Sequence, residues 1–247
     1  MKTIIEKSTV SQAYMKPVVM FAFFIGLCLA GISASAYVIR DDFAGHTVGD
    51  VLNGTTTPTG GAMWVVKPNT ADFVFGTNCL KVLENAEAYV TFASNNAIVR
   101  VQGDLNNTNA NGWLGLSMGG TSSYPLSNPG IGLLVRANGY FYLQVNAPTV
   151  HEFYDTSHFN VGAFNTFAME YNSYTGTVSV WENGYQMLTN LACASPGPIG
   201  LAGFYNNVND PLLPSFTNFQ VDVAVPEPAM LSLLALGVLA LGRRRRC

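Results

Sequence analysis

The chain has few charged residues, and their distribution excludes one large class of partner. Only 11% of its 247 residues are charged, and the net charge is −3. Seven of the twelve basic residues lie near the chain ends, at positions 2, 7, 16 and 243–246. Residues 37–224 contain thirteen acidic and five basic residues, a net charge of −8. Nucleic acid is therefore not expected as a partner, because binding a phosphate backbone requires clustered Lys and Arg.

The sequence also lacks the common catalytic and metal-binding motifs. It has no Cys-x-x-Cys pair, no His-Glu-x-x-His and no Gly-x-Ser-x-Gly, which excludes a zinc ribbon, a zincin helix and a nucleophile elbow. His151 and His158 are seven positions apart, a spacing that no common metal site uses. We expect them to lie in a surface loop, and we expect no metal site and no cofactor.

Four cysteines are present, and two of them lie outside the terminal segments. Cys28 and Cys247 belong to those segments, whereas Cys79 and Cys193 belong to the body. Export to an oxidising compartment would favour a Cys79–Cys193 disulfide. The alternative is two isolated buried thiols, because sequence alone does not establish the required approach of the two Cα atoms.

The N-terminus has the organisation of a signal peptide. Three lysines precede an apolar run at 18–32, and Ala34-Ser35-Ala36 then supplies the small-x-small pattern of a signal peptidase site. We place the signal peptide at residues 1–36 and the mature start at Tyr37. Leu27 before Cys28 is unlike the Gly, Ala or Ser of a lipoprotein signal, so lipidation is not expected.

The C-terminus combines a helix breaker, an apolar run and a basic cluster. Pro226, Glu227 and Pro228 precede the apolar residues 229–242, and the four arginines follow: Arg243, Arg244, Arg245 and Arg246. As a helix the apolar run would rise about 21 Å, short of the roughly 30 Å hydrocarbon core of a bilayer. Four arginines should remain cytoplasmic, which places the body on the other side of the membrane.

This order of elements resembles the PEP-CTERM sorting signal of bacterial exported proteins. The resemblance implies that residues 225–247 form a hydrophobic sorting helix, which an exosortase recognises and cleaves. The alternative is an ordinary C-terminal anchor helix. In both cases the two termini would first associate with the membrane. The body of the exported protein would then lie at the cell surface or in the extracellular matrix.

The body, residues 37–224, has the pattern of an all-β domain. At 97–102, Ala97, Val99 and Val101 alternate with Arg100 and Gln102, as in a half-buried strand. Asn-Gly pairs predict type I′ hairpin turns at 138–139, within 132–145, and at 183–184, within 177–188. Further strands are expected at 38–43, 80–83, 88–92, 113–118, 167–171, 199–202 and 216–223. The sequence therefore predicts an antiparallel β-sandwich.

Several segments resemble the concanavalin A-like, laminin-G-like jelly roll. They are Asp41-Asp42-Phe43, YTGTVSVWENG at 174–184, PIGLAGFY at 198–205 and the strand at 216–223. The resemblance spans about residues 38–223 and implies a glycan as the partner class, since lectins and glycan-active enzymes share this fold. In relatives calcium binds at the rim. Asp41, Asp42, Asp50 and Asp210 are candidate ligands here, but we assign no metal.

Catalytic carboxylates are not recognisable. Laminarinase-type enzymes of this fold carry Glu-x-Asp-x-x-Glu on one strand, and this chain has no such spacing. The nearest approach is Glu84-Asn85-Ala86-Glu87, which we interpret as a turn. Glu182 precedes a hairpin turn, where a carboxylate is normally exposed. We therefore expect no enzyme activity. The alternatives are a glycan hydrolase or lyase with an unrecognised site, and a purely structural matrix protein.

One tryptophan marks a candidate glycan contact. In the hairpin at 177–188, Val178, Val180 and Met187 share the predicted core face, whereas Trp181 lies opposite, next to Gln186. An indole beside an amide on a sheet face can stack on a pyranose ring and orient its hydroxyls. The alternative is that a loop or the second sheet covers Trp181.

Overall fold

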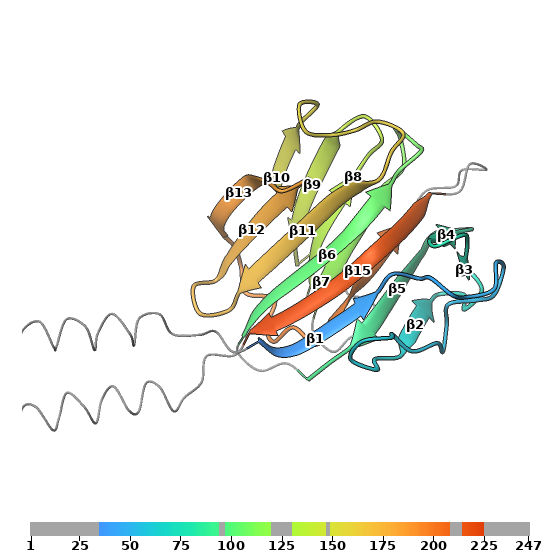
Figure 1. The fold of residues 1–247 in the computed structure, drawn as a ribbon. Coiled ribbons are helices and arrows are strands. Elements are labelled where there is room, and N and C mark those ends of the chain that lie inside the picture. Colours follow the sequence, from blue (N-terminus) through green and yellow to red (C-terminus); the bar gives the residue numbers. More distant parts are fainter. Residues whose placement is uncertain (1–34, 94–96, 120–129, 147–148, 208–213, 225–247) are drawn as a thin grey trace, which may run out of the picture. The chain divides into compact units, whose positions relative to one another are not determined.

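The body of the chain is an antiparallel β-sandwich (Figure 1). The structure is a computed structural model, and it describes residues 35–93, 97–119, 130–146, 149–207 and 214–224. Residues 35–225 form one compact unit. Within the described residues, fifteen strands form two sheets, and each strand pair is antiparallel. The predicted fold class is confirmed. The predicted signal and sorting helices lie outside the described residues.

The first sheet has eight strands, and its outer face carries the candidate site. Its order is β13 (Tyr185–Ala192), β12 (Thr177–Glu182), β11 (Asn165–Asn172), β6 (Ile98–Asn106), β15 (Ser215–Ala224), β4 (Leu80–Val82) and β3 (Phe73–Phe75). β1 (Ser35–Asp41) pairs with the second half of β15, beyond the point where β4 pairs with its first half.

The second sheet has seven strands and closes the core from the other side. Its order is β10 (Thr149–Tyr154), β9 (Tyr140–Val145), β8 (Gly130–Val135), β7 (Leu114–Gly119), β14 (Leu201–Asn206), β5 (Ala86–Thr91) and β2 (Trp64–Lys67). A bend at Glu84 and Asn85 carries the chain from β4 in the first sheet to β5 in the second. The turn expected over Glu84–Glu87 is therefore correct for its first half only, because Ala86 and Glu87 belong to β5.

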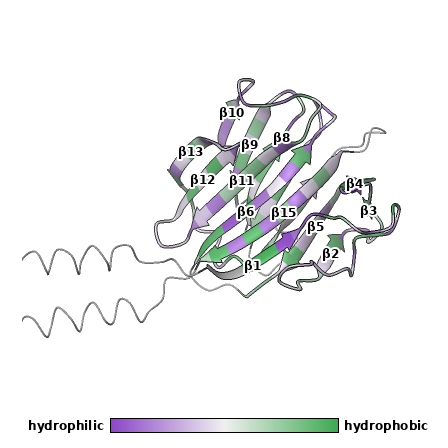
Figure 2. Ribbon diagram, in the orientation of Figure 1, coloured by the Kyte–Doolittle hydropathy of each residue, from purple (hydrophilic) through white to green (hydrophobic). Residues whose placement is uncertain are grey.

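Alternating burial explains how these segments form a sandwich. Along β6, Val99 and Val101 are buried while Arg100 and Gln102 are partly exposed, as the sequence predicts. The same alternation continues along β15 and is visible as interleaved hydrophobic and hydrophilic segments (Figure 2). At the centre of the core, Trp64 and Phe204 stack with their ring centroids 6.0 Å apart.

Three strands were not predicted. β2 and β3 are only four and three residues long, and β10 follows an Asn-Ala-Pro segment that suggests a loop. Strands this short give too little alternation for a period of two to be recognised. All three are edge strands of their sheets, so the two-layer architecture does not depend on them.

The two Asn-Gly turns differ from one another. At 183–184 both residues have positive φ, 47° and 83°, so the expected type I′ turn is present. At 138–139 only Gly139 has positive φ, 79°, and the type I′ prediction is wrong. There the Arg136 amide donates to the Tyr140 carbonyl oxygen and the Gly139 amide to the Arg136 carbonyl oxygen. This is a three-residue loop in which only the last residue needs positive φ.

The predicted Cys79–Cys193 disulfide is absent, and both thiols are free. Cys79 lies in the turn between β3 and β4, and Cys193 directly follows β13. β13 and β3 are the first and last strands in the order of the eight-stranded sheet. Because neighbouring strands are about 4.8 Å apart, this separation far exceeds the Cα approach of about 7 Å that a disulfide allows.

Candidate functional site

A row of mostly polar side chains crosses the outer face of the eight-stranded sheet. Successive Cα pairings align one residue from each of six strands. We call these residues the polar row: Gln186, Trp181, Ala168, Gln102, Gln220 and Arg40. At about 4.8 Å per strand, the five steps of the row span about 24 Å. Such a row is long enough to run beside an extended chain of several sugar rings.

A bulge in β15 creates a pocket at one end of the polar row. Three residue steps on β15, from Thr217 to Gln220, face two steps on β6. Asn218 sits in this bulge with φ of 50°, a conformation that Asn tolerates better than most residues, and its amide donates to Asp104. The bulge therefore interrupts the flat surface of the sheet where the pairing of β15 with β1 ends, at Phe219.

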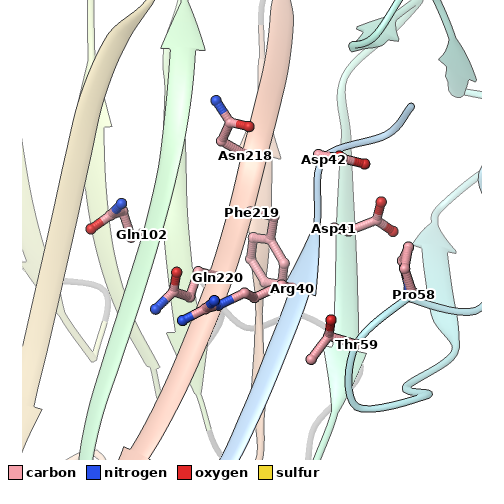
Figure 3. A pocket seen from close by; sticks show the side chains of 9 residues that line it. All are labelled: Arg40, Asp41, Asp42, Pro58, Thr59, Gln102, Asn218, Phe219 and Gln220. Atoms are coloured by element: carbon pink, nitrogen blue, oxygen red, sulfur yellow. The ribbon is translucent and has the colours of Figure 1, made fainter.

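The pocket has a volume of about 320 Å³ (Figure 3). Its walls include Arg40, Gln102 and Gln220 of the polar row, together with Pro58 and Thr59. Arg40 and Gln220 are cross-strand partners, and their side chains lie side by side in Figure 3. Backbone hydrogen bonds between Arg40 and Thr59, in both directions, hold the loop against the outer edge of β1.

Beneath the pocket, Asp41 anchors the edge strand to the core. One carboxylate oxygen accepts a 2.9 Å hydrogen bond from Trp64 Nε1, and the other accepts one from the Phe43 amide. Burial raises the pKa of Asp41 above its usual value, although these two donors act in the opposite direction. Asp41 is therefore a structural residue rather than a free ligand. The residue of the bulge that faces inward, Phe219, packs 4.8 Å from the Trp64 ring.

Several polar groups of the row are available to a ligand. In the described part of the chain, the side-chain amides of Gln102 and Gln186 have no hydrogen-bond partner, and Arg40 has no ion-pair partner. Gln220 differs, because its amide donates to Asp222 at 2.6 Å. Planar amides offer both donors and acceptors, and a guanidinium offers five donors. These side chains can therefore form hydrogen bonds with the hydroxyl groups of a sugar chain.

Trp181 lies on the outer face, as its sequence pattern indicates. Its neighbours Val178 and Val180 are fully buried in the core, so Trp181 points away from the seven-stranded sheet and that sheet does not cover it. Gln186 is its cross-strand partner. The Arg100 guanidinium lies 4.4 Å from the indole centroid and occupies part of the ring. The half-buried indole is therefore held in place by a cation–π contact.

Other residues singled out in the sequence are not part of this face. The sorting residues Pro226, Glu227, Pro228 and Arg243 to Arg246 lie outside the described residues, as do Ala34 and Asp210. The backbone of Ala36 belongs to β1, which begins at Ser35. No group of three His, Cys, Asp or Glu residues that could hold a metal ion is found among the described residues.

The interpretation of Glu182 as an exposed hairpin carboxylate is wrong. Its side chain has no exposed surface. It follows Val178 and Val180 at intervals of two, so the alternation along the strand contained the signal that it faces inward. The expectation of a surface loop is also wrong for His151, which lies in β10 and pairs with Leu143. His158 does lie in a loop, where its ring stacks on Tyr185 at 3.9 Å and its Nδ1 lies 2.8 Å from Asp155 Oδ2.

Sequence reasoning missed most of the polar row. The alternation at 97–102 places Gln102 on the outward face of its strand, but it does not identify Arg40 and Gln220 as its neighbours. Their alternation with buried residues identifies the face on which each lies. The pairing of β6 with β15 joins segments more than one hundred residues apart, and no local pattern gives that register.

A family model named "PEP-CTERM protein-sorting motif" matches residues 224–246. No curated protein matches the chain by sequence. Among solved structures, lectin II from Ulex europaeus is similar with 8% identity and a TM-score of 0.52, over 78% of this chain and all of the lectin. Basic winged bean lectin is similar with 11% identity and a TM-score of 0.51, over 77% of this chain and 99% of that one.

Trypanosoma rangeli sialidase is also similar, with 15% identity and a TM-score of 0.52, over 84% of this chain but 36% of the sialidase. At these identities the likeness concerns the fold alone. The chain therefore carries a PEP-CTERM sorting motif after a β-sandwich whose fold is similar to that of these lectins. The motif indicates a secreted protein that is sorted, through processing at the membrane, to the cell surface or the extracellular space.

Proposed function

We propose that this protein is a non-catalytic, cell-surface or matrix protein that binds polysaccharide along the polar row. An exosortase would process its C-terminal tail, and signal peptidase would remove residues 1–36. The observation that carries the binding proposal is the alignment of Trp181, Gln102 and Arg40 on one sheet face, next to a pocket. Lectins of similar fold support carbohydrate as the ligand class.

The chemistry of the polar row suits a neutral or acidic sugar chain. The amides of Gln102 and Gln186 can donate to and accept from ring hydroxyls, and Arg40 can additionally bind a carboxylate. The indole of Trp181 supplies an apolar surface, and Arg100 fixes its orientation before ligand arrives. A preorganised contact loses less side-chain entropy on binding than a mobile one.

Binding without catalysis is favoured by the positions of the carboxylates. Glu182, which has its pKa raised to about 7 by burial, has the value expected of a general acid. It faces the core, however, and has no exposed surface through which it could reach a sugar. On the outer face, Asp104 accepts hydrogen bonds from Thr166 and Asn218, and Asp222 accepts one from Gln220. These bonds favour a structural role for both.

A glycan array probed with the sandwich domain, residues 37–224, tests this proposal together with a reducing-sugar assay on every glycan that is bound. We expect retention of at least one polysaccharide and no release of reducing ends. Release of reducing ends would instead establish a glycan hydrolase. An array without a bound glycan would favour a purely structural matrix protein.

A further inference from the structure

Glu182 is a buried carboxyl group that has no hydrogen-bond partner among the described residues. It is the last residue of β12. Its cross-strand neighbours are Phe167 in β11 and Tyr185 in β13. Phe167 is itself fully buried. An ionised carboxylate in such a place would lose its hydration without gaining a donor.

The charged groups near Glu182 come from the loop between β10 and β11. Asp155 is one of them, and its negative charge disfavours a second carboxylate nearby. His158 is the other, but its Nδ1 is already engaged by Asp155. Burial is the main cause that raises the pKa of Glu182 to about 7, and Asp155 adds to it while His158 opposes it. The side chain is therefore uncharged in mildly acidic solution.

Glu182 lies at the point that closes the β12–β13 hairpin. Asn183, the next residue, donates from Nδ2 to the His158 carbonyl oxygen and to Asn165 Oδ1, and its Oδ1 accepts from the Thr166 amide. The contact with His158 joins the turn to the loop at 155–164, and the other two join it to the start of β11. Because Glu182 has no exposed surface, hydration of its ionised carboxylate would require the structure around this turn to open. Trp181, on the other side of Glu182, and Gln186 belong to the same hairpin.

We infer that Glu182 is a proton switch for the β12–β13 hairpin and, through it, for the polar row. With Glu182 uncharged, the hairpin is closed and presents Trp181 and Gln186 in register. With Glu182 ionised, water enters at the turn, the hairpin loosens and glycan binds less tightly. The last step rests on the proposed function, whereas the effect on the hairpin does not.

The direction in which folding stability depends on pH follows from the raised pKa of Glu182. The pKa rises from 4.5 to about 7 in the folded protein, so between these values the folded state holds a proton that the unfolded state has released. The stabilisation is complete below pH 4.5, is lost as the pH rises to about 7, and does not change further above it. The unfolding equilibrium constant should increase on the order of 100-fold across this range because of Glu182 alone.

The test compares the sandwich domain and its Glu182→Gln variant by urea unfolding and by amide hydrogen exchange at pH 5 and pH 8. Since all other groups are the same in the two proteins, their difference isolates Glu182. We expect the roughly 100-fold change in the unfolding equilibrium constant in the native domain only. After correction for the intrinsic exchange rate, the amides of the hairpin should also exchange faster at pH 8 than at pH 5 in the native domain only. Glu182→Leu should match Glu182→Gln, and Glu84→Gln, which removes an exposed carboxylate, should match the native domain.

Retention of the full pH dependence by both Glu182 variants would overturn the inference and implicate another group, such as His158. A calcium-induced stabilisation at pH 8 that needs Glu182 would also overturn it, because a cation would then occupy the site. Binding to the glycan identified on the array should weaken at least about tenfold from pH 5 to pH 8 in the native domain and not in Glu182→Gln. Equal binding at both pH values would overturn the link to the polar row.

The two proposals fail separately. If no glycan binds at either pH while hairpin exchange follows Glu182, the proposed function is wrong and the switch stands. If glycan binds and neither stability nor exchange depends on Glu182, the switch is wrong and the proposed function stands.

Discussion

Replacing Trp64 by Ala should remove about 3–5 kcal/mol from the free energy of unfolding, a large part of the 5–15 kcal/mol typical of a domain. Trp64 is fully buried and its ring contacts Phe43, Phe204 and Phe219, so its removal leaves a cavity between the two sheets. The substitution also removes a donor from the buried carboxylate of Asp41. Urea unfolding of the sandwich domain measures the effect.

Trp113→Ala is the matched control for this experiment. Trp113 is half-buried and stacks on Tyr142 and under Arg136, with centroid distances of 4.3 Å and 4.1 Å. Its truncation should cost about 1 kcal/mol, the range of a partly exposed cation–π contact. Equal losses for the two variants would show that Trp64 is not a central element of the core.

The second large effect concerns the C-terminal tail. In a host that carries the exosortase, we expect the exported protein to be cut near Pro226 to Pro228. Its apolar segment is shorter than the hydrocarbon core of a bilayer, which disfavours a permanent membrane anchor. Intact mass spectrometry of surface material should then find chains that end in this region. Replacing both prolines by alanine should leave the chain uncut.

Recovery of full-length chains ending in Cys247 from the native protein would contradict processing and favour an ordinary anchor. A strain without the exosortase provides the control, because there the full-length chain is the expected product. No helix of the described residues is long and apolar enough to cross a membrane.

The sequence predicts much of the fold because the chain forms strands with clear alternation. Val99, Val101 and their outward neighbours assign β6 correctly, and the Asn183-Gly184 turn fixes the β12–β13 hairpin. The candidate site is less predictable. Trp181 and Gln186 are close in sequence and were recognised together, whereas Gln102, Gln220 and Arg40 meet only through long-range strand pairing.

Two predictions from the sequence are wrong for different physical reasons. The expected oxidising compartment favours a Cys79–Cys193 disulfide, but sheet order places the two cysteines at opposite edges. A charged residue next to a turn is normally exposed, which predicts Glu182 at the surface, although the alternation along its strand predicts that its side chain faces inward. The separation of the two cysteines depends on sheet order, which local patterns do not contain, whereas the period of two along β12 does indicate the inward position of Glu182.

The most direct test of the central claim is calorimetric titration of the bound polysaccharide into Trp181→Ala and Trp113→Ala. Each variant loses an indole that contacts an arginine. Trp181 lies on the eight-stranded sheet, whereas Trp113 stacks on Tyr142 of the seven-stranded sheet. The melting temperatures of both variants should therefore fall by similar, small amounts. We predict that Trp181→Ala loses at least about tenfold in affinity and that Trp113→Ala binds like the native domain. Unchanged affinity in Trp181→Ala, or a loss only in Trp113→Ala, would contradict the polar row as the binding site.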